Sequence, residues 1–135
     1  MDLTGLRVLL VEDEAMLSTL TEEYLEELGC KVVVAARLED ALEKARTRLV
    51  DVAVLDVNLA GQMSYPVAEI LHARGVPVVF ATGYGVAGLP NDLRTIPVMT
   101  KPFRQEQLAE AIGALAGGKV ARSRAPHGAE AEAGH

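Results

Sequence analysis

The chain has 135 residues, with 13 Lys and Arg against 19 Asp and Glu, and therefore a formal net charge of −6. Cys30 is the single cysteine, which excludes an internal disulfide and a cysteine-rich zinc site and fits a reducing compartment. The length suits one domain with its own core. The acidic balance argues against a nucleic-acid binder, and no apolar run approaches the roughly 20 residues that a membrane span needs.

The first half of the chain alternates between two hydrophobic patterns. Residues 6–11 form a short aliphatic run that predicts a buried strand. A helix is predicted next, because Leu17, Leu20, Tyr24, Leu25 and Leu28 recur at helical spacing and Gly29 is a typical helix stop. A second strand follows at 32–35, and a second helical pattern runs from Leu38 to Leu49.

The second half repeats this alternation. Strands are predicted at 52–55, 76–80 and 96–99, and helices at 66–74 and 104–115. Residues 85–95 are typical of a loop, with at most a short helix at 91–94. From 116 the composition changes to Gly, Ala and charged residues without large apolar periodicity, which indicates a flexible tail over 116–135.

Strands that alternate with helices predict an α/β fold in which a parallel sheet is covered on both faces. Ligands of such sheets bind outside the carboxyl ends of the strands. At these ends the sequence places two acids (Glu12 and Asp13), a third acid (Asp56), a hydroxyl (Thr82) and an amine (Lys101). Clustered carboxylates favour Mg²⁺, and a carboxylate beside a cation can accept a phosphoryl group as a nucleophile.

Four motifs, VLLVEDE, VAVLDVNLAG, VVFATGYG and VMTKPF, follow one another in an order that resembles a response-regulator receiver domain over about residues 5 to 115. The resemblance implies a doubly wound, flavodoxin-like fold with a five-stranded parallel sheet in the strand order 2-1-3-4-5. It also implies a receiver domain over 1–115 and a tail over 116–135.

The resemblance assigns a metal site and a phosphoacceptor. Asp56 matches the phosphoacceptor, and Asp13 and Asp56 match direct ligands of Mg²⁺. Glu12 matches the acid that reaches the metal through water, and Asn58 stands where the family uses the backbone carbonyl as a ligand.

The resemblance also assigns the groups that contact the phosphoryl oxygens. Thr82 matches the hydroxyl that follows the phosphate during switching, and Lys101 matches the lysine that contacts a phosphoryl oxygen. The peptide bond before Pro102 is expected to be cis by the same analogy.

One position departs from the family pattern. Val98 stands where receivers commonly have the aromatic switch residue, three before the lysine. The segment 77–85, PVVFATGYG, resembles the motif of the mostly single-domain "FAT GUY" receivers, which lack that aromatic, except that Val78 replaces Phe. Tyr84 is then the candidate substitute switch.

Partners follow from the resemblance. We expect a phosphodonor that is a histidine kinase, of the HWE type by the group resemblance, or a histidine phosphotransfer protein. We further expect a cytoplasmic receiver that signals by protein contacts, without nucleic acid or membrane, as a monomer or weak dimer. The Glu-rich face of the first helix is a candidate kinase contact, and residues 89–98 are a candidate dimer surface.

Other hypotheses remain at this point. An aspartyl-phosphate phosphohydrolase would also use a nucleophilic Asp, but such enzymes place a second acid where Asn58 stands. A pseudo-receiver that binds a partner without phosphorylation, and a receiver cut from a hybrid kinase, are further alternatives. The GxGxxG pattern at 83–88 follows the fourth predicted strand, which is the wrong context for a dinucleotide site.

Overall fold

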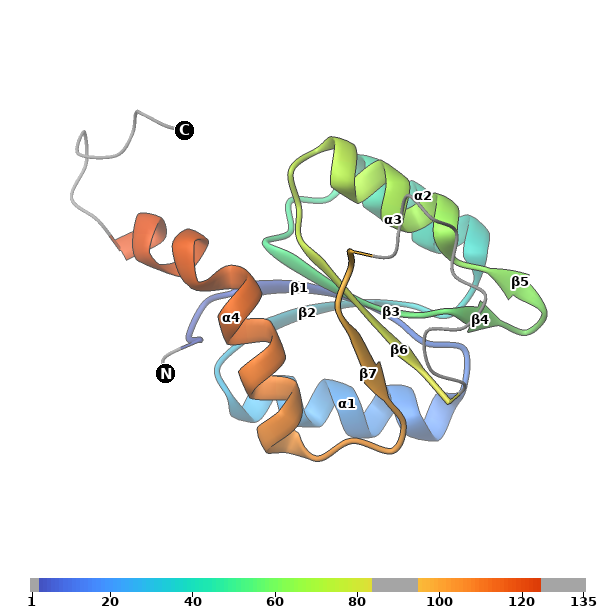
Figure 1. Cartoon of the computed structure of the whole chain (residues 1–135), viewed down its shortest axis with the longest axis horizontal. Coiled ribbons are helices and arrows are strands. Elements are labelled where there is room, and N and C mark those ends of the chain that lie inside the picture. The colour runs from blue at the N-terminus through green and yellow to red at the C-terminus, as the bar shows by residue number, and fades with distance from the viewer. Residues whose placement is uncertain (1–2, 84–94, 125–135) are drawn as a thin grey trace.

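The computed structural model describes residues 3–83 and 95–124 (Figure 1). Five strands form one parallel sheet in the order β2-β1-β3-β6-β7, which confirms the predicted α/β fold and strand order. The strands of this sheet are β1 (Arg7–Val11), β2 (Lys31–Ala35), β3 (Val52–Asp56), β6 (Val78–Thr82) and β7 (Val98–Thr100).

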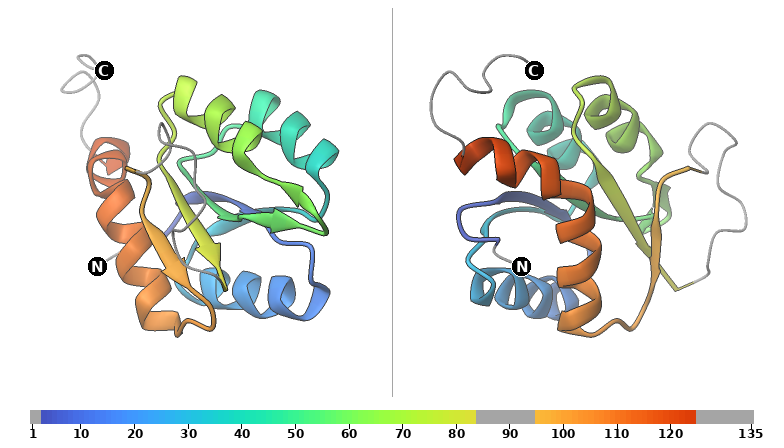
Figure 2. Two further views of the ribbon diagram at one scale, coloured as in Figure 1. Left: turned by 45° about the vertical axis from the view of Figure 1, so that its right-hand side comes forward. Right: turned by 60° about the vertical axis from the view of Figure 1, so that its left-hand side comes forward.

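The helices cover both faces of the sheet. Helices α2 and α3 lie together on one face, and α1 and α4 lie on the other (Figures 1 and 2). Their bounds are α1 (Ala15–Glu27), α2 (Leu38–Thr47), α3 (Tyr65–Ala73) and α4 (Gln105–Arg124). Within the part of the chain that the structure describes, no helix is long and apolar enough to cross a membrane.

Each face of the sheet has its own hydrophobic cluster, because successive side chains of a strand point to opposite faces. Leu9 and Val11 of β1 pack with the helices α2 and α3, whereas Val8 and Leu10 pack with α1 and α4. All five residues of β3 are buried, as expected for the central strand of a doubly covered sheet. The aliphatic runs of the sequence therefore mark the centre of the fold.

Several local features differ from the sequence expectations, among them the bounds of β6 and β7, which begin two residues later than the predicted strands at 76–80 and 96–99. Helix α2 ends at Thr47, so Leu49 leaves the predicted apolar face and is 69% exposed. Helix α4 continues past the predicted end at Leu115 to Arg124, so the first part of the segment predicted as a tail is helical. A hairpin of β4 (Asn58–Leu59) and β5 (Gln62–Met63) follows β3 and was not predicted.

Some expectations lie outside the described residues. They are the short helix at 91–94, most of the loop at 85–95, the greater part of the candidate dimer surface at 89–98, and Tyr84.

Candidate functional site

The sheet register brings four strand ends to one edge. Asp56 is the last residue of β3 and pairs with Ala81 of β6, and Thr82 at the end of β6 pairs with Thr100 of β7. Glu12 follows β1, and its backbone N–H donates to the carbonyl of Ala35 at 3.1 Å. Residues far apart in the sequence therefore meet because the strands are parallel and in register.

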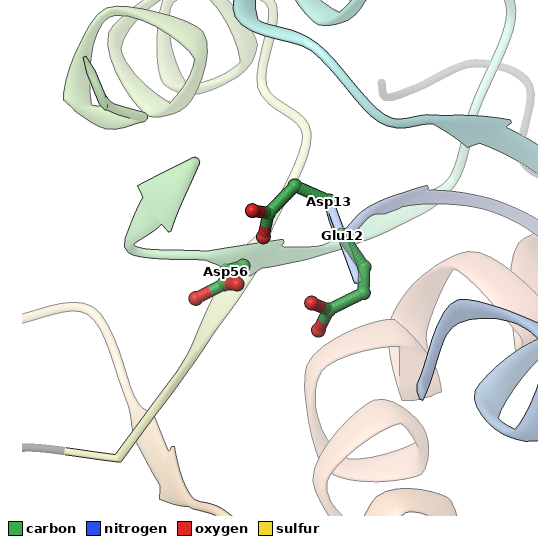
Figure 3. A group of neighbouring side chains, drawn as sticks. All are labelled: Glu12, Asp13 and Asp56. Carbon is green, nitrogen blue, oxygen red and sulfur yellow. The ribbon is translucent and has the colours of Figure 1, made fainter. Parts of the chain in front are cut away.

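Three carboxylates converge at this edge (Figure 3). Glu12, Asp13 and Asp56 each offer one oxygen, and these oxygens lie within 4.8 Å of one another. Glu12 and Asp56 are buried and Asp13 is exposed, so the group lies between the core and the solvent. Oxygen donors of this kind fit a hard divalent cation such as Mg²⁺ better than a softer transition metal.

Lys101 lies against two of these acids. Its Nζ donates to Glu12 Oε1 at 2.7 Å and lies 3.2 Å from Asp56 Oδ2. Burial opposes the charged form of Lys101, but its hydrogen bonds and attraction to Glu12 and Asp56 outweigh this, so its pKa is raised. The ammonium group thus stays charged and offsets part of the negative charge of the carboxylates.

The main chain of Lys101 is hydrogen-bonded to the end of β6. The N–H of Lys101 donates to the carbonyl of Thr82 at 2.9 Å, which extends the pairing of β6 and β7. The Lys101–Pro102 peptide bond is cis.

Asp56 has an unusual protonation equilibrium. Burial of the carboxyl group, with repulsion from Glu12, raises its pKa from 3.8 to about 6, although attraction and a hydrogen bond from Lys101 oppose the rise. The side chain nevertheless ionises near neutral pH, which a nucleophilic carboxylate requires.

An open cavity of about 500 Å³ lies over the carboxylates. Its lining residues are Asp13, Asp56, Asn58, Ala60, Gly61, Gly83 and Lys101. Two of the three carboxylates and Lys101 therefore border one solvent-accessible cavity.

The remaining predicted residues have different surroundings. Thr82 is buried at the carboxyl end of β6. Val98 is half-buried, pairs in register with Phe80 and packs against the α2/α3 cluster, so an aliphatic side chain fills this place beside β6.

Sequence reasoning missed one wall of the cavity. Ala60, Gly61 and Gly83 line it with small side chains or none, and such residues carry no chemical signal of a site. The one sequence signal for this wall was Gly61, because a glycine shortly after a strand is typical of a hairpin turn.

The geometry agrees with a family match. The sequence model of the response regulator receiver domain matches residues 8–113, which is most of the chain. The chain belongs to this family. It is therefore a receiver domain of two-component signalling.

Individual relatives have the same kind of domain. The receiver is 31% identical over 115 residues to the probable transcriptional regulator ycf27 of Guillardia theta, covering 81% of this chain and 44% of the relative. It is 27% identical over 115 residues to the cell cycle response regulator CtrA of Brucella ovis, covering 82% of this chain and 50% of the relative. The chain thus spans about half the length of the curated relatives it matches.

Solved structures give the same picture. SdrG from Sphingomonas melonis Fr1 is 39% identical, with a TM-score of 0.72 over 82% of this chain and 96% of that chain. The receiver domain of the sensor histidine kinase PA1611 from Pseudomonas aeruginosa PAO1 is 25% identical, with a TM-score of 0.73 over 84% of this chain and 99% of that chain. That crystal structure has a magnesium ion coordinated in the active site cleft.

Proposed function

We propose that Asp56 accepts a phosphoryl group from a phosphohistidine of a histidine kinase or histidine phosphotransfer protein, with Mg²⁺ as cofactor. The observation that carries this proposal is the placement of Asp56 with two further carboxylates and Lys101 at the carboxyl ends of the strands. Within a family of phosphoacceptor domains, this set supplies a nucleophile, a cation site and a positive charge.

The cation site is formed by oxygen atoms of this chain. Asp13 and Asp56 would hold Mg²⁺ directly, Glu12 through water, and Asn58 through its backbone carbonyl. When bound, Mg²⁺ would neutralise part of the negative charge of the carboxylates and of the incoming phosphoryl group. The three carboxylates outnumber the single ammonium of Lys101 among the side chains at the site, so a divalent cation would balance their remaining charge.

In the transfer step an Oδ atom of Asp56 attacks phosphorus. The new O–P bond forms as the N–P bond of the phosphohistidine breaks, and the electron pair of that bond returns to the imidazole nitrogen. Lys101 would move from the Asp56 carboxylate to a phosphoryl oxygen, and the Thr82 hydroxyl would donate to another. Phosphoryl transfer needs such positioning and charge stabilisation more than covalent help from the protein.

Signalling would follow from these new contacts. When Thr82 turns toward the phosphoryl group, the surface at the carboxyl end of β6 would change, and a protein partner would bind this changed surface. Because Val98 replaces the usual aromatic residue, we assign the substitute switch role to Tyr84.

The decisive experiment measures phosphoryl uptake. Purified protein is incubated with Mg²⁺ and a phosphorylated histidine kinase, and the acid-labile phosphoprotein is followed on phosphate-affinity gels. We expect uptake by the wild type and by Asp51→Asn, a control at a buried carboxylate paired with Arg7 at the amino ends of the strands. We expect no uptake by Asp56→Asn. Equal labelling of Asp56→Asn would contradict the proposal.

The identity of the donor is the finer part of the proposal. We propose a kinase of the HWE type, a cytoplasmic location in keeping with the free thiol of Cys30, and a monomer or weak dimer. A phosphotransfer profile at short times against all histidine kinases of the source organism tests the first point. Preferential transfer from a kinase of another type would contradict it.

A further inference from the structure

The hairpin that follows Asp56 has a tight two-residue turn. Ala60 has a φ of 54° and Gly61 a φ of 93°, so both turn residues occupy the left-handed region. This is the backbone of a type I′ turn, which matches the twist of a hairpin but disfavours residues with a Cβ atom. Ala60 therefore holds a conformation that it adopts at a cost.

The hairpin register determines where the main chain of Asn58 points. Leu59 pairs with Gln62, Asn58 pairs with Met63, and the N–H of Ser64 donates to the carbonyl of Val57 at 2.9 Å. Because pairs in an antiparallel ladder alternate, Asn58 belongs to a pair whose main-chain groups point away from the partner strand. Its N–H and carbonyl thus share the outer edge of β4.

That outer edge faces the phosphoacceptor. The N–H of Asn58 makes a long hydrogen bond of 3.4 Å to Asp56 Oδ1. Since the N–H and C=O of one strand residue point to the same side, the Asn58 carbonyl also lies on the side of Asp56. The hairpin register is therefore what offers this carbonyl to the carboxylate group.

The side chain of the same residue holds the turn closed. Asn58 Oδ1 accepts a hydrogen bond from the N–H of Gly61 at 2.6 Å. Each strand of the hairpin has only two residues, so the strand pairing stabilises the hairpin little against the cost of the left-handed conformation of Ala60. One buried side chain, Leu59, anchors the hairpin to the core. The contact from Asn58 to Gly61 is thus a large share of what keeps the hairpin in register.

We propose that the side chain of Asn58 is a positioning residue of the cation site: by accepting the Gly61 N–H, it keeps the hairpin β4–β5 closed and its own carbonyl directed at the carboxylates. This inference rests on the proposed function, since it concerns the cation that the phosphoacceptor site would use. It assigns the amide side chain a role in addition to the carbonyl.

The test compares three variants at this residue with a control on the opposite strand. Asn58→Ala removes the acceptor, Asn58→Gln displaces it by one methylene, and Asn58→Asp keeps an oxygen at the same place. Gln62→Ala changes the exposed partner strand of the same hairpin. For each protein, amide hydrogen exchange of Gly61 is measured without metal, the dissociation constant for Mg²⁺ is measured by chemical-shift titration, and folding is checked by circular dichroism.

We expect Asn58→Ala and Asn58→Gln to speed exchange of the Gly61 amide and to weaken Mg²⁺ binding by about 3- to 10-fold, the range that the net contribution of one hydrogen bond allows. Gln62→Ala should keep the Gly61 exchange rate and the Mg²⁺ affinity within about twofold of the wild type. Asn58→Asp should keep the Gly61 exchange rate within about twofold and should bind Mg²⁺ at least as tightly as the wild type, within about twofold. If Asn58→Ala does not fold, the Asn58→Gln result decides.

Two outcomes would overturn the inference. Unchanged Mg²⁺ affinity in a folded variant whose Gly61 amide exchanges faster would separate the turn from the cation site. Unchanged exchange of Gly61 in both variants would show that Asn58 does not hold the turn. Failure of the wild type itself to bind Mg²⁺ or accept phosphate would instead refute the proposed function.

Discussion

Replacing Asp56 by its neutral isostere should stabilise the metal-free protein. The wild-type carboxyl is buried beside Glu12, and its pKa is raised from 3.8 to about 6. This difference corresponds to about 3 kcal/mol at about 1.4 kcal/mol per pKa unit. This value already includes the opposing attraction to Lys101 at 3.2 Å, and Lys101 keeps its contact with Glu12 at 2.7 Å. Because the buried amide of Asn offers one more N–H donor than a protonated carboxyl and that donor needs a partner, we expect a net gain of about 1–2 kcal/mol at pH 7.

The pH dependence has a definite sign. A carboxyl whose pKa is higher in the folded state binds more protons when folded, so its unfavourable contribution is fully present above about pH 6 and disappears as the pH falls toward 3.8. The advantage of Asp56→Asn over the wild type should thus be largest at pH 7 and shrink between pH 6 and pH 4.

The assay is urea and thermal unfolding with EDTA present, at pH 7 and pH 4. A gain of this size corresponds to a rise of roughly 3–8 °C in Tm for a domain of this length. Asp51→Asn is the matched control: it removes the negative charge and one of the two oxygens that Arg7 contacts at 3.1 and 3.0 Å, and it should lower stability at pH 7. If Asp56→Asn is no more stable than the wild type at pH 7 without metal, the electrostatic reasoning about the site is wrong.

Three further predictions concern neighbouring features. Lys101→Met should lower the free energy of unfolding by about 1–3 kcal/mol and slow phosphoryl uptake at least tenfold, because Glu12 and Asp56 lose their ammonium partner; wild-type values in urea unfolding and in the uptake assay would contradict this. Gly29→Ala should lower the free energy of unfolding, measured in urea, by more than about 2 kcal/mol, because Gly29 has a φ of 92° and an added Cβ would lie 2.9 Å from Thr4 Cα. Gly75→Ala is the control, since Gly75 has a φ of 77° but open space around it, and it should lower the free energy of unfolding by about 1–2 kcal/mol. An equal cost at both glycines would rule out the close approach as a cause. Ala60→Gly should raise stability by up to about 1 kcal/mol by relieving the left-handed residue, and a lower Tm would argue against strain there.

Most of the fold could be predicted from local hydrophobic patterns in the sequence. The aliphatic runs around Leu9, Val54 and Val79 marked the central strands, because a strand covered on both faces needs apolar side chains on both. Helix ends were less predictable. The apolar period continued through Leu49, but α2 ends at Thr47, because the chain must turn there to enter β3.

The main residues of the candidate site could also be predicted from the sequence. Residues that directly follow buried strands must lie at the carboxyl edge of a parallel sheet, so Asp56, Thr82 and Lys101 could be placed together before any distance was known. The wall of the cavity that the β4–β5 hairpin forms could not be predicted, since Ala60 and Gly61 have no functional groups and the turn depends on an alanine in the left-handed conformation, which alanine disfavours.

The sequence by itself determined the order of strands and helices, the receiver family and the identity of the polar residues at the strand ends, because these depend on local hydrophobic period and on motif. The tertiary structure alone decided the contacts between them. The 2.7 Å approach of Lys101 to Glu12 joins residues 89 positions apart, the raised pKa of Asp56 depends on burial, and the direction of the Asn58 main chain depends on hairpin register. Each of these arises from packing between distant segments, which a local pattern does not encode.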